Sequence, residues 1–132
     1  MEAVIIVAII ALVAMISVPN ISGWISSHRL SSVAQQIASE LLLARAKGVS
    51  ERRNINFTIV TGTGYYATYQ HSPGGEIKHV SQSVTISGVS GDNPIIFNSR
   101  GMASNDTTIS LLNEKGITKS VNVNVAGRVV IN

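Results

Sequence analysis

Few residues in this chain have the types and spacing that enzyme chemistry requires. The three histidines, His28, His71 and His79, are too scattered for a metal cluster and lack carboxylates at ligand spacing. The absence of cysteine excludes a disulfide framework, a thiolate zinc site and a cysteine nucleophile. Gly62-x-Gly64 lacks the lysine and following helix of a phosphate loop, and no serine lies in a nucleophile elbow. We therefore expect exposed loop histidines, a hairpin turn at Gly62-x-Gly64, and no catalytic residue, metal, cofactor or enzymatic activity.

Basic side chains gather near residue 50. The cluster consists of Arg45, Lys47, Arg52 and Arg53. In the favoured interpretation they lie near a helix C-terminus, where positive charge complements the helix dipole. In the alternative they contact the phosphate backbone of a nucleic acid, with Tyr65, Tyr66 and Tyr69 as stacking platforms.

Charge is distributed unevenly along the 132 residues. Only 13% of them are charged, against roughly 25% in typical soluble domains. Glu2 is the only charged side chain before Arg29, so the later part carries 10 − 6 = +4. Residues 3–16 contain no polar side chain, and the run continues through Ser17 and Val18 to Pro19. At 1.5 Å per residue, a helix over this run would nearly cross the hydrocarbon core of a bilayer.

Three interpretations of this apolar run compete. A secretory signal peptide needs a basic flank and a small-residue cleavage site, whereas here the flank is acidic and Pro19 disrupts the cleavage region. A plain single-pass anchor explains the length but not Glu2, because a carboxylate deep in lipid costs roughly 2.5–3.5 kcal/mol. The third interpretation is that Glu2 has a partner and that the helix serves assembly.

The segment as a whole resembles the mature N-terminus of type IV pilins and type II secretion pseudopilins. Glu2 matches the glutamate at the fifth mature position of that family, and Pro19 matches its helix-breaking proline. By this resemblance, three residues including a Phe, and a basic leader before them, would precede Met1. The resemblance implies that Glu2 pairs with the N-terminal amine of a neighbouring subunit, which would relieve the desolvation of both charges.

A helix break is expected between Met15 and Gly23. Pro19 lacks an N–H group and its ring clashes with the carbonyl of Met15, and Gly23 is a weak helix former. The simple interpretation is a kink in one long helix, whereas the family resemblance implies that this stretch becomes extended in the packed filament. Trp24 follows the break, and its amphipathic ring suits a membrane interface.

The rest of the chain predicts a second helix and then a β-rich region. Apolar residues at helical spacing over 24–52 are Leu30, Val33, Ala34, Ile37, Leu41, Ala44 and Gly48. The predicted strands are 56–61, 65–69, 83–86, 95–97, 108–112, 120–125 and 128–131, with no βαβ unit. We expect an α+β fold in which a long N-terminal α-helix, apolar in its first half and amphipathic in its second, packs on a C-terminal antiparallel β-sheet. The expected organisation is an apolar helix over 1–27, an amphipathic helix over 28–53 and a β-rich domain over 54–132.

The second half resembles one subgroup of the family, the H-type (GspH/FimT-like) pseudopilins and pilins. The similar segments are LLLARAK at 41–47, RRN at 52–54, Ile96-Phe97 with Gly101, Ile109-x-Leu111, Gly116, Val121-x-Val123 and Gly127-Arg128-Val129. We interpret Gly127-Arg128 as turn chemistry rather than as a ligand site.

These patterns together predict a structural subunit, pilin or pseudopilin, of a type IV pilus-like helical filament. One alternative is a minor H-type pseudopilin at the tip of a type II secretion pseudopilus. Another is a DNA-binding FimT-like minor pilin in DNA uptake, and a third is an anchored domain that never assembles. The resemblance implies copies of the chain or other pilins as partners, together with a platform protein, an ATPase and a prepilin peptidase. It implies residence in the bacterial inner membrane before assembly, and then in a periplasmic or cell-surface filament.

Overall fold

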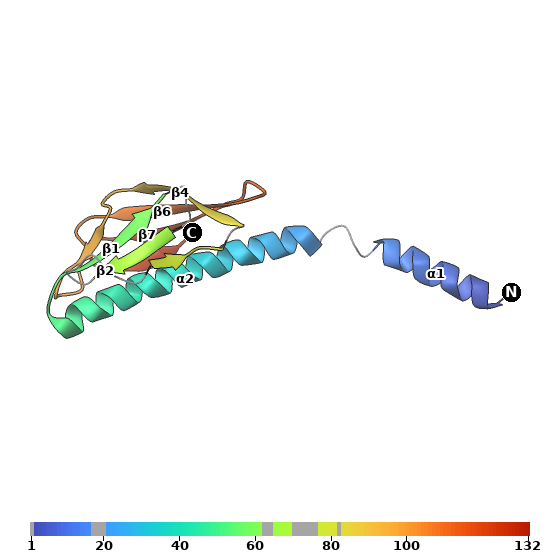
Figure 1. Cartoon of the computed structure of the whole chain (residues 1–132), viewed down its shortest axis with the longest axis horizontal. Coiled ribbons are helices and arrows are strands. Elements are labelled where there is room, and N and C mark those ends of the chain that lie inside the picture. Colours follow the sequence, from blue (N-terminus) through green and yellow to red (C-terminus); the bar gives the residue numbers. More distant parts are fainter. Residues whose placement is uncertain (1, 17–20, 62–64, 70–76, 82) are drawn as a thin grey trace.

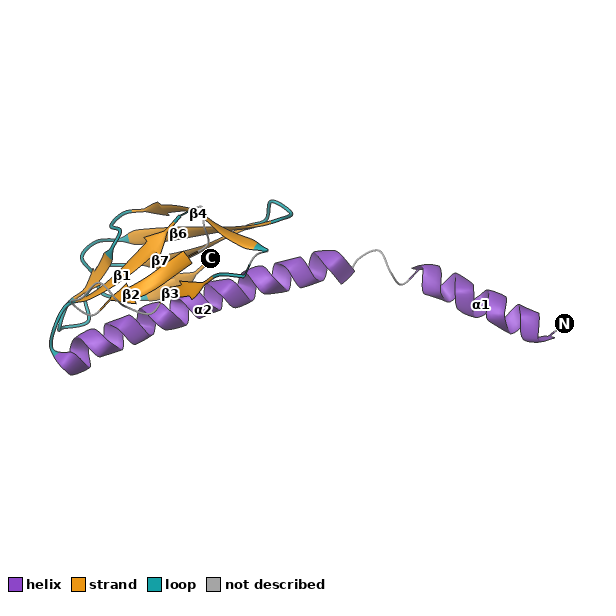
Figure 2. Cartoon of the chain, in the orientation of Figure 1, coloured by secondary structure: helices purple, strands orange, loops and turns teal. Residues whose placement is uncertain are grey.

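The computed structural model describes residues 2–16, 21–61, 65–69, 77–81 and 83–132, apart from the side chains of Glu2, Ile16 and residues 65–69. Two helices come first, α1 (Glu2–Ile16) and α2 (Ile21–Glu51). The strands that follow are β1 (Ile55–Val60), β2 (Tyr65–Tyr69), β3 (Ile77–His79), β4 (Val84–Ser90), β5 (Ile95–Phe97), β6 (Thr107–Asn113), β7 (Thr118–Val123) and β8 (Val129–Ile131). Helix α2 lies along the strands, and α1 lies beyond its N-terminal end, away from them (Figure 1, Figure 2). The predicted α+β arrangement is confirmed.

The strands form two antiparallel sheets of four strands each. The first has the order β3-β2-β1-β5 and the second has the order β4-β6-β7-β8. Strand β1 extends its pairing beyond β5 through a side chain, because the Ile59 N–H donates to Asn93 Oδ1 over 2.9 Å and Asn93 Nδ2 donates back to the Ile59 carbonyl. The central strands are β2 and β1 in the first sheet and β6 and β7 in the second.

The apolar stripe of α2 closes that core. All seven residues predicted for the stripe are buried, and Ala38 joins them. Helix α2 contacts strands of both sheets, and its stripe forms one apolar cluster with inward side chains such as Phe57, Phe97 and Leu111. Each of these large side chains contributes about 1.5–3 kcal/mol when it is fully buried. The helix is thus fixed to the β-rich part along most of its length, from Leu30 to Gly48.

Strand β7 begins and ends two residues earlier than predicted, and the ends of β1, β6 and β8 differ from the prediction by one residue. Two larger differences concern β3 and β4. Strand β3 was not predicted; it pairs with β2, and Lys78 on it forms an ion pair with Glu40 on α2. Strand β4 continues to Ser90 through Gly88, where we expected a loop to begin. The pairing of β4 with β6 shifts register between Ile86 and Gly88, so that Ser87 forms a bulge and the strand continues past the glycine.

Helix α2 ends on a residue that is unusual at that position. Arg52 has a φ of 53°, in the left-handed region, and the Arg53 N–H donates to the Gly48 carbonyl over 3.3 Å. This is the Schellman type of helix ending, in which the left-handed position is usually glycine. An arginine there bears a conformational cost that glycine would not.

Replacing Arg52 by glycine is therefore expected to stabilise the fold by about 0.5–1 kcal/mol, since the released strain exceeds the added freedom of the unfolded chain. The free energy of unfolding from urea titrations of the full chain in a neutral detergent measures the change. Arg52→Ala is the matched control, because alanine removes the side chain but keeps the strained φ. An equal gain in both variants would assign the effect to the arginine side chain and contradict the backbone explanation.

Candidate assembly site

Helix α1 leaves its apolar side chains uncovered. Every side chain from Ala3 to Met15 is exposed, and Val4 and Met15 are 70% and 76% exposed. A continuous apolar surface of this kind indicates contact with lipid or with other proteins, because its exposure to water is energetically unfavourable. In the described part of the chain, no helix has both the length and the apolar character needed to cross a membrane.

The polar and helix-breaking residues predicted for this region fall at its borders. Glu2 begins α1, but its side chain lies outside the described residues, as does Pro19 within 17–20. Gly23, which we expected to belong to the break, lies inside α2, because that helix begins two residues earlier at Ile21. The pairing of Glu2 and the role of Pro19 stay predictions.

The uncovered apolar surface continues onto the first turns of α2. Ile21, Trp24 and Ile25 are 57%, 70% and 39% exposed. The Trp24 ring lies 5.5 Å from the His28 ring, in a tilted arrangement. The start of α2 therefore combines apolar surface with an amphipathic ring, which suits a boundary between an apolar phase and water.

A second exposed apolar patch lies near the other end of α2. Leu42, Leu43 and Val49 are 47–48% exposed. Leu42, Ala46 and Val49 follow each other at spacings of four and three and so share one helical face. Helix α2 thus buries one face in the core and presents apolar side chains on another, which is what a helix needs to contact a neighbouring helix as well.

Close contacts join this end of α2 to two turns of the β-rich part. Arg45 Nε donates to the Gly101 carbonyl over 2.9 Å. Gly101 and Gly127 are both buried and have φ values of 77° and 75°. A Cβ on Gly127 would lie 2.0 Å from the Gly101 carbonyl oxygen and 2.8 Å from Arg45 Nε. These three residues form what we call the Arg45–Gly101–Gly127 junction.

Two of the four basic residues predicted as a possible nucleic-acid contact form contacts within the fold. Arg45 belongs to the junction, and Arg53 Nε donates to Glu51 Oε2 over 2.6 Å. Arg52 is exposed at the helix end, and Lys47 is half-buried. The tyrosine side chains at 65, 66 and 69 lie outside the described residues. The four basic residues therefore gather at the end of α2, but at least two of them are engaged within the fold.

The two histidines that the structure describes lie on regular elements rather than in loops. His28 is exposed on α2 and His79 is exposed on β3, whereas His71 is outside the described residues. The loop placement was wrong for His28, which lies in the helix that was itself predicted over 28–53, and for His79, because β3 was not predicted. In the part of the chain that the structure describes, no group of three or more His, Asp or Glu could hold a metal ion. The turn expected at Gly62-x-Gly64 lies outside the described residues.

Most of the chain matches a known protein family. A family model described as type II transport protein GspH matches residues 33–127. The chain belongs to the GspH family. The match includes all three residues of the Arg45–Gly101–Gly127 junction, and it begins after α1, Glu2 and Pro19. A comparison with curated protein sequences finds no significant match.

Two solved structures have the same fold as this GspH-family chain. One is the minor pseudopilin EpsH from the type 2 secretion system of Vibrio cholerae, with a TM-score of 0.65 and 12% identity over 79% of this chain and 96% of that one. The other is the type IV minor pilin FimU of Pseudomonas aeruginosa, with a TM-score of 0.66 and 16% identity over 80% and 90% of the two chains. Family and fold are those of a structural pilin or pseudopilin subunit.

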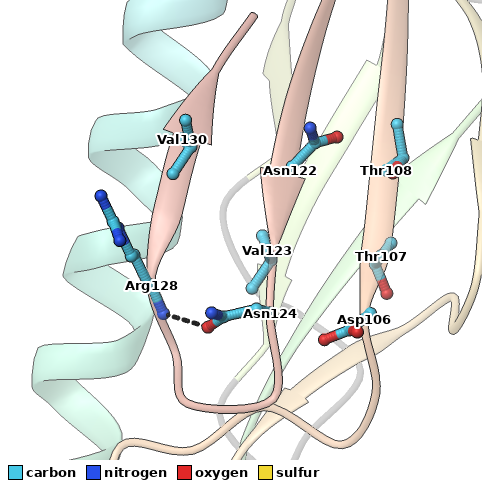
Figure 3. A pocket seen from close by; sticks show the side chains of 8 residues that line it. All are labelled: Asp106, Thr107, Thr108, Asn122, Val123, Asn124, Arg128 and Val130. Atoms are coloured by element: carbon cyan, nitrogen blue, oxygen red, sulfur yellow. Dashed lines mark hydrogen bonds between the residues drawn. The ribbon is translucent and has the colours of Figure 1, made fainter.

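A hollow of about 220 Å³ on the second sheet was not predicted from the sequence. Its lining residues come from the neighbouring strands β6, β7 and β8 and their ends, and the Arg128 N–H donates to Asn124 Oδ1 over 2.9 Å (Figure 3). Within the described residues, Asn122 Oδ1 is buried here without a hydrogen-bond partner. Separate segments create this hollow, so no sequence motif marks it.

Asp92 forms a further polar contact in the β-rich part of the GspH-family chain. Hydrogen bonds from Asn105 and Ser104 lower the pKa of its carboxyl below the ordinary value, and the Asn105 bond measures 2.9 Å. Because the folded pKa is the lower one, these bonds favour the fold above the ordinary pKa and are lost as the pH falls through the folded value. Asp92 lies half-buried at the surface, so we interpret this contact as a surface feature rather than as a functional site.

Proposed function

We propose that this GspH-family chain enters a type IV pilus-like filament from the bacterial inner membrane, with α1 as the element that moves from lipid into the filament core. The observation that carries the proposal is the exposure of every side chain from Ala3 to Met15. Lipid covers such a surface before assembly, and the corresponding helices of neighbouring subunits cover it afterwards. The same apolar side chains are thus satisfied in both environments.

The exposed patch of Leu42, Leu43 and Val49 supports the same proposal, because it extends the apolar helix surface available for contact beyond α1.

Glu2 adds a charged group to the otherwise apolar N-terminal segment. A carboxylate at the start of an apolar helix favours the location where it finds a cation, and we propose the N-terminal amine of a neighbouring subunit. Partners in this account are copies of the chain or other pilin-type subunits, delivered by a platform protein, an ATPase and a prepilin peptidase.

The family match favours a secretion pseudopilus as a second, more specific placement. The description type II transport protein supports the secretion system, and the similar fold of EpsH, a minor pseudopilin, supports a minor subunit, which we place at the tip of such a filament. A nucleic-acid role has less support, because Arg45 and Arg53 form contacts within the fold.

Fractionation of cells that produce the tagged full chain tests the proposal. We expect the chain in the inner-membrane fraction and also in purified filaments, where mass spectrometry identifies it beside other pilin-type subunits. Deletion of its gene should lower filament number or protein secretion by at least about tenfold. A chain found only in the membrane fraction of cells that make normal filaments would contradict the proposal and support the anchored domain.

A further inference from the structure

A second hollow lies at the end of α2 that connects to α1. It has a volume of about 270 Å³ and is bounded by the first turns of α2 and by the turn between β6 and β7. Its polar lining residues are Ser22, Ser26, Arg29, Ser83, Glu114 and Lys115. Ser22, Ser26 and Arg29 follow each other at spacings of four and three, so one face of α2 supplies two hydroxyls and a guanidinium.

The turn opposite this face is held against the helix. Asn113 is only 4% exposed, and its Oδ1 accepts hydrogen bonds from the backbone N–H groups of Lys115 (3.0 Å) and Ile117 (2.8 Å). Its Nδ2 donates to Ser26 Oγ over 3.1 Å. Lys115 Nζ donates to Ser22 Oγ over 3.3 Å. The hollow is therefore a built feature, in which the ammonium group of Lys115 is directed to the hydroxyl side.

The chemistry of this lining fits an oxyanion. Arg29 and Lys115 bring two positive charges against one from Glu114, and Ser22, Ser26 and Ser83 bring hydroxyl donors. Arg29 and Lys115 form neither of the two ion pairs found in the described part of the chain. The positive end of the α2 dipole lies at the same place, since the helix begins at Ile21. Guanidinium, ammonium and hydroxyl donors around a helix start are a typical combination for phosphate.

The position of the hollow indicates where such a phosphate comes from. Six residue steps separate Ile16, the last residue of α1, from Ser22, and such a stretch spans at most about 22 Å. Headgroups occupy roughly the outer 5–8 Å on each side of a bilayer. Trp24, 70% exposed, lies at the same end of α2 and suits that layer. With α1 in the hydrocarbon, the hollow lies within reach of the headgroups.

We propose that this hollow binds the phosphate group of an anionic phospholipid and holds the β-rich part at headgroup level before assembly. The proposal rests on the membrane stage of the proposed function. It concerns the isolated subunit, however, and so can fail or succeed independently of filament entry.

The test uses the full chain in uncharged maltoside micelles, titrated with the soluble short-chain lipid dihexanoyl phosphatidylglycerol and, in a separate titration, with inorganic phosphate. Amide chemical shifts of Ser26, Lys115 and Ile117 report binding. We expect saturable shifts with the lipid and an affinity for inorganic phosphate that is at least about tenfold weaker. The double variant Arg29→Gln/Lys115→Gln should lose at least about tenfold in lipid affinity, as expected for the loss of two charge-assisted hydrogen bonds.

Two further variants separate a site from a general charge effect. Glu114→Gln removes the one negative charge of the hollow and should tighten lipid binding about two- to threefold, which a structural disturbance would not do. Lys47→Gln/Arg128→Gln removes the same total charge as Arg29→Gln/Lys115→Gln, from outside the hollow, and should leave the lipid affinity unchanged.

Absence of lipid-dependent shifts, or an equal loss of lipid affinity in both double variants, would overturn the proposal. Inorganic phosphate that binds as tightly as the lipid would overturn the lipid as the source. A chain that binds lipid but never enters filaments would contradict the proposed function alone.

Discussion

Replacing Glu2 by leucine is expected to leave the chain in the membrane and to reduce its amount in filaments by at least about a hundredfold. Glu2 is the only charged side chain between Met1 and Ser27. Removing one partner of a buried ion pair costs about 3–5 kcal/mol, and each 1.4 kcal/mol changes an equilibrium tenfold. The measurement is quantitative mass spectrometry of the chain in purified filaments, relative to its amount in the inner membrane.

Two controls accompany this experiment. Glu51→Gln removes one negative charge from the exposed end of α2, where an ion pair contributes little, and should leave filament entry unchanged. Glu2→Asp keeps the charge and should retain part of the assembly. If Glu2→Leu enters filaments as well as the parent chain, the carboxylate has no assembly role, and the apolar surface of α1 alone would have to account for assembly.

Replacing Gly127 by alanine is expected to destabilise the fold by about 3–5 kcal/mol. The new methyl group would lie 2.0 Å from the Gly101 carbonyl oxygen and 2.8 Å from Arg45 Nε, so both turns and the arginine would have to shift. The left-handed backbone adds a cost of about 1–2 kcal/mol. Urea unfolding of the full chain in a neutral detergent, followed by far-ultraviolet circular dichroism, measures the loss.

Gly116 provides a matched control for this prediction. It has a φ of 77°, close to that of Gly127, and a Cβ there would meet nothing within 4 Å. Gly116→Ala should therefore cost only the backbone strain, about 1–2 kcal/mol. The difference between the two variants isolates the steric cost at the Arg45–Gly101–Gly127 junction. Equal losses would show that this junction is not closely packed.

Elements with a strong periodic pattern were predictable from the sequence. The α2 stripe was, because Leu30, Ile37 and Leu41 repeat at helical spacing and must be covered. Strand β3 was not predictable, because it has only three residues and its Ile77 is 59% exposed. Its place depends on pairing with β2 and on the ion pair between Lys78 and Glu40, which arise only in the folded chain.

The candidate site was predictable in part, for similar reasons. An apolar run marks α1 directly, whereas the roles of Glu2 and Pro19 come from a family resemblance. We grouped Arg45 with its basic neighbours because the sequence shows the charge of a residue but not its hydrogen-bond partner. Its spacing of four from Leu41 and three to Gly48 did place it beside the buried stripe, and that was the available signal for its contact with Gly101. The hollow at the start of α2 joins residues about 90 positions apart, such as Ser22 and Lys115, so no local pattern could indicate it.

The central claim is that α1 becomes part of a filament core, and crosslinking from α1 within filaments tests it most directly. A photoreactive amino acid at Ile9, which is 56% exposed in the single chain, would be activated in purified filaments and the adducts identified by mass spectrometry. We predict adducts with the N-terminal helix of a neighbouring pilin-type subunit. Filaments that contain the chain but give no such adducts would contradict the account.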